Sequence, residues 1–187
     1  MTLFPRLPPG FTLTPICEDE IPVLQELAAT IWRHAYTGMI TVEQIEYMLG
    51  SRYTPERIRA YLDHDDRGLL LLKQAGGPIG YCSHAVGADS TEMKLEQLYL
   101  LERFRGRGLG SAMLGHVETL ARQFGCRSVV LTVNKQNIAA IGFYRAAGFA
   151  VRHEAVFDIG GGFVMDDYVM EKRLREGRTA AGADSAT

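Results

Sequence analysis

The pattern of apolar and polar residues in the first third of the chain predicts one strand followed by a long helix. Phe11–Ile16 alternates weakly, as a strand with one buried face does. A helix is expected from about Asp19, because an acidic residue suits the positive end of the helix dipole. Its apolar positions recur at helical spacing, at Ile21, Leu24, Leu27, Ala28 and Ile31.

Capping signals predict two further helices. Thr41 is followed three residues later by Gln44, which is the pattern of a capping box, so a second helix is expected over Thr41–Leu49. Thr54 precedes Pro55, and proline is favoured at the first position of a helix. A third helix is therefore expected to extend to about Leu62.

The rest of the chain alternates between short apolar runs and two more helical patterns. Glycine-containing turns separate the runs, and the helices are expected from Leu109 to about Gly125 and over Ile138–Ala147. The predicted strands are Leu69–Lys73, Pro78–Val86, Met93–Leu100, Ser128–Val133, Phe149–Phe157 and Phe163–Leu174. This order predicts a mixed α/β (α+β) domain around one sheet of about seven strands. The domain is expected to span residues 1–175, and the small polar residues 176–187 are expected to be a disordered tail.

Composition narrows the class of protein. With 187 residues, 47% hydrophobic and 22% charged, the chain has the make-up of a soluble globular domain. It contains no apolar run near the roughly 20 residues that cross a membrane, and Met1–Gly10 lacks the apolar core of a secretory signal, so we expect a cytoplasmic protein. The net charge of −2 gives no reason to expect a nucleic-acid partner.

Cysteine and histidine spacing argues against a disulfide framework and against a metal site. Cys17, Cys82 and Cys126 are odd in number and include no C-x-x-C pair. All three lie in or beside apolar segments, so they are expected to be small buried thiols. The five histidines show no metal-ligand spacing, so no metal is expected.

A glycine-rich loop lies between a predicted strand and an amphipathic helix. It reads Arg105-Gly106-Arg107-Gly108-Leu109-Gly110. Unpaired backbone amides and the helix dipole favour an anion at the start of a helix, and glycine lets a phosphate approach closely. The glycine spacing differs from a Rossmann fingerprint, and no G-K-[ST] of a P-loop is present. An ordinary glycine-rich turn is the alternative interpretation of this loop.

The loop and a second segment together resemble the GNAT superfamily of N-acetyltransferases. R-x-x-G-x-G over Arg105–Gly110 resembles the pyrophosphate-binding motif of that family. Residues 137–149 resemble its second signature, N-x-x-A-x-x-F-Y-x-x-x-G-F, and the resemblance covers roughly residues 11–174. It implies the GNAT fold, a central mostly antiparallel sheet flanked by helices, and the transfer of an acetyl group from acetyl-CoA to an amine.

The resemblance also implies how acetyl-CoA is held. Main-chain groups around Leu98, Tyr99 and Leu100 would pair with the pantetheine arm, and one amide there would face the oxyanion. The amides of the loop would take the pyrophosphate, through Arg105, Gly106, Arg107, Gly108, Leu109, Gly110 and Ser111. Asn137 would hydrogen-bond the pantetheine, and Ala140, Ile141 and Tyr144 share its helical face by spacing.

Two side chains are candidates for proton transfer. Tyr144 lies where the family keeps its tyrosine and is expected to protonate the departing thiolate; the alternative is a core tyrosine beside Phe143. Glu96 is the preferred carboxylate for taking a proton from the ammonium, with Glu92 in reserve, if strand alternation places Glu92, Lys94, Glu96, Leu98 and Leu100 on one face. A β-bulge would change that facing. Surface charges without a catalytic role are the alternative for both carboxylates.

The acceptor is left open between a small amine, a polyamine and a peptide or protein amine. Trp32, His34 and Tyr36 either line the amine pocket or pack in the core. The acidic stretch Asp63-His64-Asp65-Asp66 would attract cationic amines, although a solvated loop is the simpler interpretation. A non-catalytic acyl-CoA-binding module and a nucleotide-binding regulator are the competing functions. From the family, a homodimer through the closing strands is expected.

Overall fold

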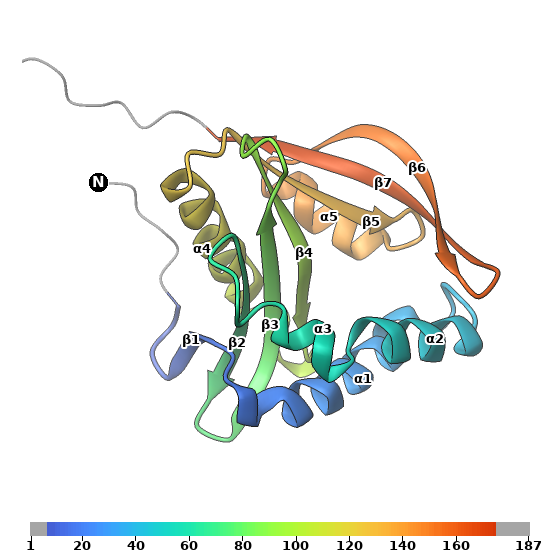
Figure 1. Cartoon of the computed structure of the whole chain (residues 1–187), viewed down its shortest axis with the longest axis horizontal. Helices are drawn as coiled ribbons and strands as arrows, with labels where there is room; N and C mark the ends of the chain where they lie inside the picture. Colours follow the sequence, from blue (N-terminus) through green and yellow to red (C-terminus); the bar gives the residue numbers. More distant parts are fainter. Residues whose placement is uncertain (1–6, 175–187) are drawn as a thin grey trace, which may run out of the picture.

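A computed structural model describes residues 7–174 and contains one seven-stranded sheet (Figure 1). The strand order is β1-β2-β3-β4-β5-β7-β6, and every neighbouring pair is antiparallel except β4 with β5. The strands are β1 (Phe11–Pro15), β2 (Arg67–Gln74), β3 (Gly77–Val86), β4 (Glu92–Leu100), β5 (Ser128–Asn134), β6 (Ala150–Gly160) and β7 (Phe163–Arg173). The predicted mixed, mostly antiparallel sheet is therefore confirmed.

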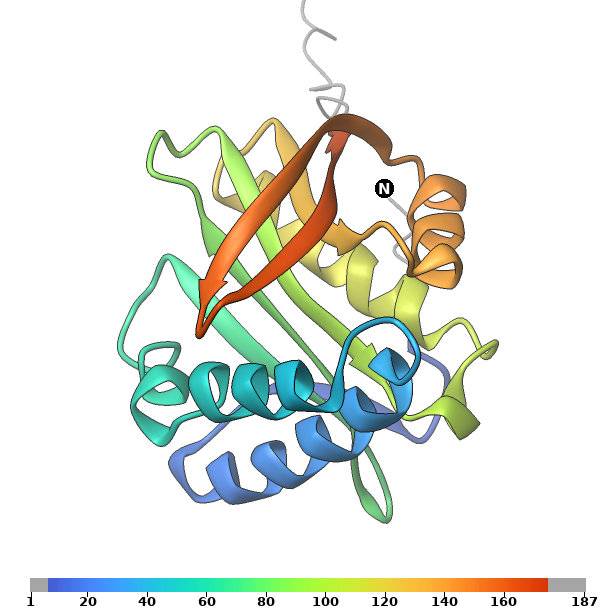
Figure 2. The same cartoon turned by 90° about the vertical axis from the view of Figure 1, so that its right-hand side faces the viewer.

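Helices cover both faces of the sheet (Figures 1 and 2). On one face lie α4 (Leu109–Gln123) and α5 (Ile138–Ala146), and on the other lie α1 (Ile21–Tyr36), α2 (Val42–Arg52) and the short α3 (Pro55–Arg59). Because side chains alternate along β2, Leu70 and Leu72 pack in the cluster with α4, whereas Leu69 and Leu71 pack in the cluster with α1. Two single turns of 3-10 helix, η1 (Glu18–Glu20) and η2 (Glu102–Phe104), complete the elements of the described chain.

Both predicted helix starts have a hydroxyl cap, but the capping box at Thr41 is only half formed, because the Gln44 side chain donates to the Val164 carbonyl at 2.8 Å instead. The Thr41 hydroxyl accepts a hydrogen bond from the Gln44 amide at 3.1 Å, and the Thr54 hydroxyl accepts one from the Arg57 amide at 3.3 Å. Helix α3 is shorter than the predicted span to Leu62. The amides that follow it bond three residues back, Tyr61 to Ile58 at 3.0 Å and Leu62 to Arg59 at 2.7 Å, so the chain continues as turns.

Strands β4 and β5 separate after a short junction. They pair only through Glu92 with Ser128, Met93 with Val129 and Lys94 with Val130. Beyond this junction each strand still pairs on its other edge: β4 pairs with β3 up to Leu100, and β5 pairs with β7 up to Asn134. We call the facing, unpaired edges of β4 after Lys94 and of β5 after Val130 the seam.

A β-bulge in β4 corrects the predicted facing of that strand. Gln97 pairs with Ser83 and Leu95 with the next residue, His84, which leaves Glu96 as the extra residue. As a result, Leu98 and Leu100 lie in the same cluster as Met93 and Leu95, against α4. The expectation that Lys94, Leu98 and Leu100 share one face was wrong.

The predictions for the cysteines, for a membrane span and for the tail have different outcomes. Cys82 and Cys126 are buried as predicted, but Cys17 is exposed, because it lies at the start of the surface turn η1. In residues 7–174, no helix combines the length and the apolar character that crossing a bilayer needs. The predicted disordered tail, 176–187, lies outside the described residues.

Candidate active site

A cleft of about 400 Å³ lies at the seam, on the face of the sheet that carries α4 and α5. Its walls come from β4, β5, the glycine-rich loop and α5, with Ala35 and Tyr36 at the end of α1. Of the predicted cofactor-binding residues, those that line it are Leu98, Tyr99, Leu100, Arg105, Gly106, Gly108, Gly110, Ser111, Asn137, Ala140 and Tyr144. Segments far apart in sequence thus meet in one cavity.

The glycine-rich loop leads directly into α4. Gly106 and Gly108 have positive φ angles of 74° and 75°, a conformation that favours glycine, and a Cβ at either position would meet no atom within 4 Å. Gly108 is the N-cap of α4, so the amides of Leu109, Gly110 and Ser111 belong to the first turn, where no earlier carbonyl is available. These amides and the positive end of the helix dipole create a site for an anion.

Two residues of the loop do not line the cleft with their side chains. The guanidinium of Arg107 lies 5.3 Å from the centre of the Phe104 ring, and that of Arg103 makes the same kind of contact at 5.1 Å. Leu109 is buried in the core beneath the loop. The prediction that these two residues bind the cofactor therefore concerns their main-chain groups.

Helix α5 presents small and aromatic residues to the cleft. The Asn137 side chain caps the helix by accepting a hydrogen bond from the Ala140 amide at 3.2 Å, which leaves its own N–H groups free to donate. Ala140 leaves room beside it, and Phe143 closes the wall. Ile141, which spacing placed on the same face, is buried in the core and does not line the cavity.

Tyr144 lies at the inner wall of the cleft and is only 9% exposed. Its ring packs between Phe143 and Phe149, with ring centres 5.2 and 5.6 Å away. Within residues 7–174 its hydroxyl makes no hydrogen bond, unlike that of Tyr36, which bonds the Tyr99 hydroxyl at 2.9 Å. Burial raises the pKa of Tyr144, and Tyr36 and Cys82 nearby raise it further, so the phenol is protonated at neutral pH.

Glu96, the bulged residue, lies at the beginning of the seam. Its carboxylate accepts a hydrogen bond from the Tyr61 hydroxyl at 2.7 Å. Burial and the Glu96 charge raise the pKa of Tyr61, so this phenol remains the donor of that bond. Thr132 of β5 lines the cleft together with Glu96.

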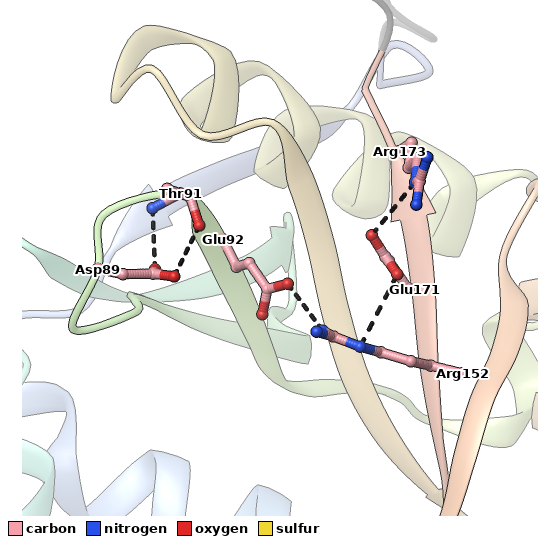
Figure 3. A network of polar contacts seen from close by, with 6 residues as sticks. All are labelled: Asp89, Thr91, Glu92, Arg152, Glu171 and Arg173. Carbon is pink, nitrogen blue, oxygen red and sulfur yellow. Dashed lines mark hydrogen bonds and ion pairs between the residues drawn. The ribbon is translucent and has the colours of Figure 1, made fainter.

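Glu92, the reserve carboxylate, is held elsewhere (Figure 3). It accepts a hydrogen bond from Arg152 of β6 at 2.7 Å, and Arg152 also lies 4.0 Å from Glu171 of β7. The figure shows this network beside the junction of β4 and β5, and none of its residues lines the cleft. Glu92 is therefore a structural partner of Arg152.

A second cavity of about 550 Å³ opens on the opposite face of the sheet, below α2 and α3. It shares Glu96, Gln97 and Thr132 with the cleft, so the two cavities meet at the seam. Asp167 of β7 lines it and is only 6% exposed, and one of its carboxylate oxygens is buried without a hydrogen-bond partner. Burial raises the pKa of Asp167 to about 6.

Sequence reasoning left the acceptor-side aromatic residues open, and the structure separates them. Trp32 is 1% exposed and donates to the Tyr81 hydroxyl at 3.1 Å, so it is a core residue. His34 is exposed and lies 2.6 Å from Glu102. Tyr36 lines the cleft, whereas the acidic stretch at residues 63–66 is exposed and lines neither cavity at the seam.

The comparison with protein families decides the class of this site. Residues 30–149 match the Acetyltransferase (GNAT) family. The chain belongs to the GNAT family. The predicted family, fold and enzyme class, an N-acetyltransferase, are thereby confirmed.

Relatives and solved structures agree with this assignment. The N-acetyltransferase is 28% identical over 151 residues to an uncharacterised N-acetyltransferase of Mycobacterium tuberculosis, covering 81% of this chain and 96% of the relative. It is 25% identical over 159 residues to spermidine N(1)-acetyltransferase of Thermoplasma acidophilum, covering 83% and 92%. The PaiA N-acetyltransferase of Thermoplasma acidophilum, solved with coenzyme A, superposes with a TM-score of 0.74 at 24% identity, over 88% of this chain and 99% of that one.

Proposed function

We propose that this N-acetyltransferase moves an acetyl group from acetyl-CoA to a primary amine by direct attack in a ternary complex. The observation that carries the proposal is the meeting of two cavities at the seam, with Tyr144 on one side and Glu96 between them. Acetyl-CoA would occupy the cleft and the amine would enter from the opposite face. A site with only one cavity would favour the alternative, a non-catalytic acyl-CoA-binding module.

The donor is held by the main chain and by α5. The first-turn amides of α4 bind the pyrophosphate, and the unpaired edge of β4 at Leu98–Leu100 hydrogen-bonds the pantetheine arm as an added strand would. The N–H groups of Asn137 donate to the same arm. A main-chain amide of this edge stabilises the oxyanion that forms on the thioester carbonyl.

The chemical step removes two protons from the ammonium nitrogen and delivers one to the thiolate. An alkylamine has a pKa near 10.4 and reaches the site as an ammonium ion, so Glu96, directly or through water, accepts a proton from it. The amine nitrogen then attacks the thioester carbonyl carbon, the C–S bond breaks, and Tyr144 donates its phenolic proton to the departing thiolate. The second proton that the nitrogen loses as the amide forms returns to the Tyr144 phenolate through water, and Glu96 releases its proton to solvent. The products are the acetylated amine and coenzyme A.

The environment of the cysteines supports direct attack over an acetyl-cysteine intermediate. Within the described chain no cysteine lines either cavity. Cys82 lies near Tyr144, but it is fully buried, and burial raises the pKa of its thiol to about 12. At neutral pH this thiol is protonated and is a poor nucleophile.

Thiol release from acetyl-CoA, followed across a panel of amines, tests the function. Release that depends on an added amine supports the transferase. Calorimetric binding of acetyl-CoA with no release over the whole panel would instead support the binding module. We also propose a single domain over residues 1–175 and a cytoplasmic location. A homodimer through β6 and β7 is a further proposal, which sedimentation of the full chain would test.

A further inference from the structure

The second cavity at the seam carries more positive than negative charge, which bears on the acceptor. Four cationic side chains line it, Arg52 from α2, Arg57 from α3, Arg67 from β2 and Lys94 from β4. Only two carboxylates, Glu96 and Asp167, face them. The lining residues have a surplus of two positive charges, or of one when Asp66, the ion-pair partner of Arg67, is counted, although the whole chain carries a net charge of −2.

Three of the four cations of this cavity have no ion-pair partner in the described chain. Within residues 7–174, none of Arg52, Arg57 and Lys94 has a carboxylate within 4.0 Å. Arg67 has Asp66 at 3.6 Å, too far for a hydrogen bond, and its Nε is buried without a partner. The Arg67 side chain as a whole is 37% exposed, so its guanidinium is open to a ligand that accepts hydrogen bonds.

The register of the sheet places two of these cations at a defined distance from the reacting centre. Arg67 pairs with Ala85, and Ala85 pairs with Lys94, so both side chains project from one row on the same face. Lys94 is in the last pair of the junction, and Glu96 follows it by two residues, about 7 Å along a strand. An acceptor with its amine at Glu96 therefore reaches the row of cations within a few bonds.

We propose that the acceptor is an anionic amine, a primary amine that carries a carboxylate or a phosphate a few bonds from its nitrogen. This inference rests on the proposed function. The amine lies between Glu96 and Thr132, the anion lies against Lys94 and Arg67, and Arg52 and Arg57 add to the field. The apolar side chains of Tyr47, Phe157 and Met165 contact the chain that joins the two groups. A polyamine has no negative group for these cations and is disfavoured by their charge.

Three acceptors of equal length test the inference, namely 4-aminobutyrate, its amide and 1,4-diaminobutane. Thiol release should give the highest kcat/KM for the acid and the lowest for the diamine, with a ratio of roughly tenfold or more because hydrogen bonds to charged groups are strong. Aminoalkyl phosphates of similar length, measured alongside, distinguish a phosphate acceptor from a carboxylate acceptor. A diamine that equals or exceeds both anionic series would overturn the proposal.

Lys94→Met and Arg67→Gln identify the groups responsible. Each should reduce the preference for the anionic acceptor over its neutral amide by roughly tenfold, mainly through KM. Arg59→Gln is the matched control, because Arg59 lies on α3 two residues from Arg57 but pairs with Glu18 at 2.6 Å outside both cavities. Lys94 is exposed, so its variant should fold normally. An unchanged preference in both variants overturns the inference alone, whereas no release with any amine contradicts the transferase function itself.

Discussion

Replacing Tyr144 by phenylalanine removes one hydroxyl and leaves the packing of the ring intact. Because that hydroxyl has no hydrogen-bond partner in the described chain, no buried group loses a bond, and we expect the free energy of unfolding to change by less than about 0.5 kcal/mol. The effect of this substitution on kcat should be much larger than its effect on stability. A general acid contributes about 10²- to 10⁴-fold, so kcat should fall by that factor, or about 2.7 to 5.4 kcal/mol of activation free energy.

The assay separates the two effects in one preparation. Steady-state thiol release gives kcat, calorimetry gives the Kd for acetyl-CoA, and thermal unfolding gives Tm. Tyr53→Phe is the matched control, since Tyr53 is buried, lies outside the cleft and bonds the Tyr81 hydroxyl at 2.7 Å. That variant should lose about 1 kcal/mol of stability and keep its kcat.

A second acyl donor makes the test specific for proton donation. If Tyr144 protonates the departing thiolate, an acetyl thioester of a more acidic thiol needs less help, and the defect of Tyr144→Phe should shrink with it. A merely structural role would give the same defect with both donors. A kcat within twofold of the original enzyme would refute the assignment.

Three other perturbations test the remaining parts of the site. Gly108→Asp should weaken acetyl-CoA binding at least tenfold more than Gly108→Asn. Both variants strain a residue with a φ of 75°, but only aspartate repels the pyrophosphate. Equal affinities in calorimetry would contradict the phosphate role of this loop. Glu96→Gln should lower kcat/KM at neutral pH by about 10²-fold, whereas Glu92→Gln should not, and equal rates for the two variants would contradict the choice of base. Asp167→Asn should stabilise the protein by roughly 1 to 3 kcal/mol at pH 8 and by little at pH 4, as followed by urea unfolding. The sign follows from the pKa of Asp167, which burial raises to about 6 in the folded state from about 3.9 in the unfolded state. The folded protein therefore loses stability as the pH rises from about 4 to 6. A variant less stable than the original at pH 8 would contradict this.

Local signals in the sequence predicted the elements and most of the cleft. Thr41 and Thr54 marked helix starts because a capping hydroxyl acts within three residues of itself. The glycine-rich loop was identifiable for the same reason, since the positive φ of Gly106 and Gly108 and the start of α4 are local properties. The family resemblance then placed Asn137 and Tyr144 on the facing helix.

Features that depend on pairing between distant segments were not predicted. The bulge at Glu96 arises from the register of β4 against β3, and no residue type in β4 signals it. The contact of Tyr61 with Glu96 and the unpartnered carboxylate of Asp167 depend on how α3 and β7 approach the sheet. The cationic row is likewise invisible in sequence, because Arg67 and Lys94 are 27 positions apart and meet only through Ala85.

The short junction between β4 and β5 also governs how the two parts of the sheet share their stability. Amides beyond Lys94 and Val130 have no ladder bonds across the seam, so small local openings expose them to hydrogen exchange. A donor that binds there fills this gap in the folded state only, and at one hundred times its Kd it adds about 2.7 kcal/mol to the stability of the whole domain. If acetyl-CoA binds along β4 as proposed, it adds the equivalent of an eighth strand to the sheet, and the domain is more stable with the donor bound than in the interval between release of coenzyme A and arrival of the next donor.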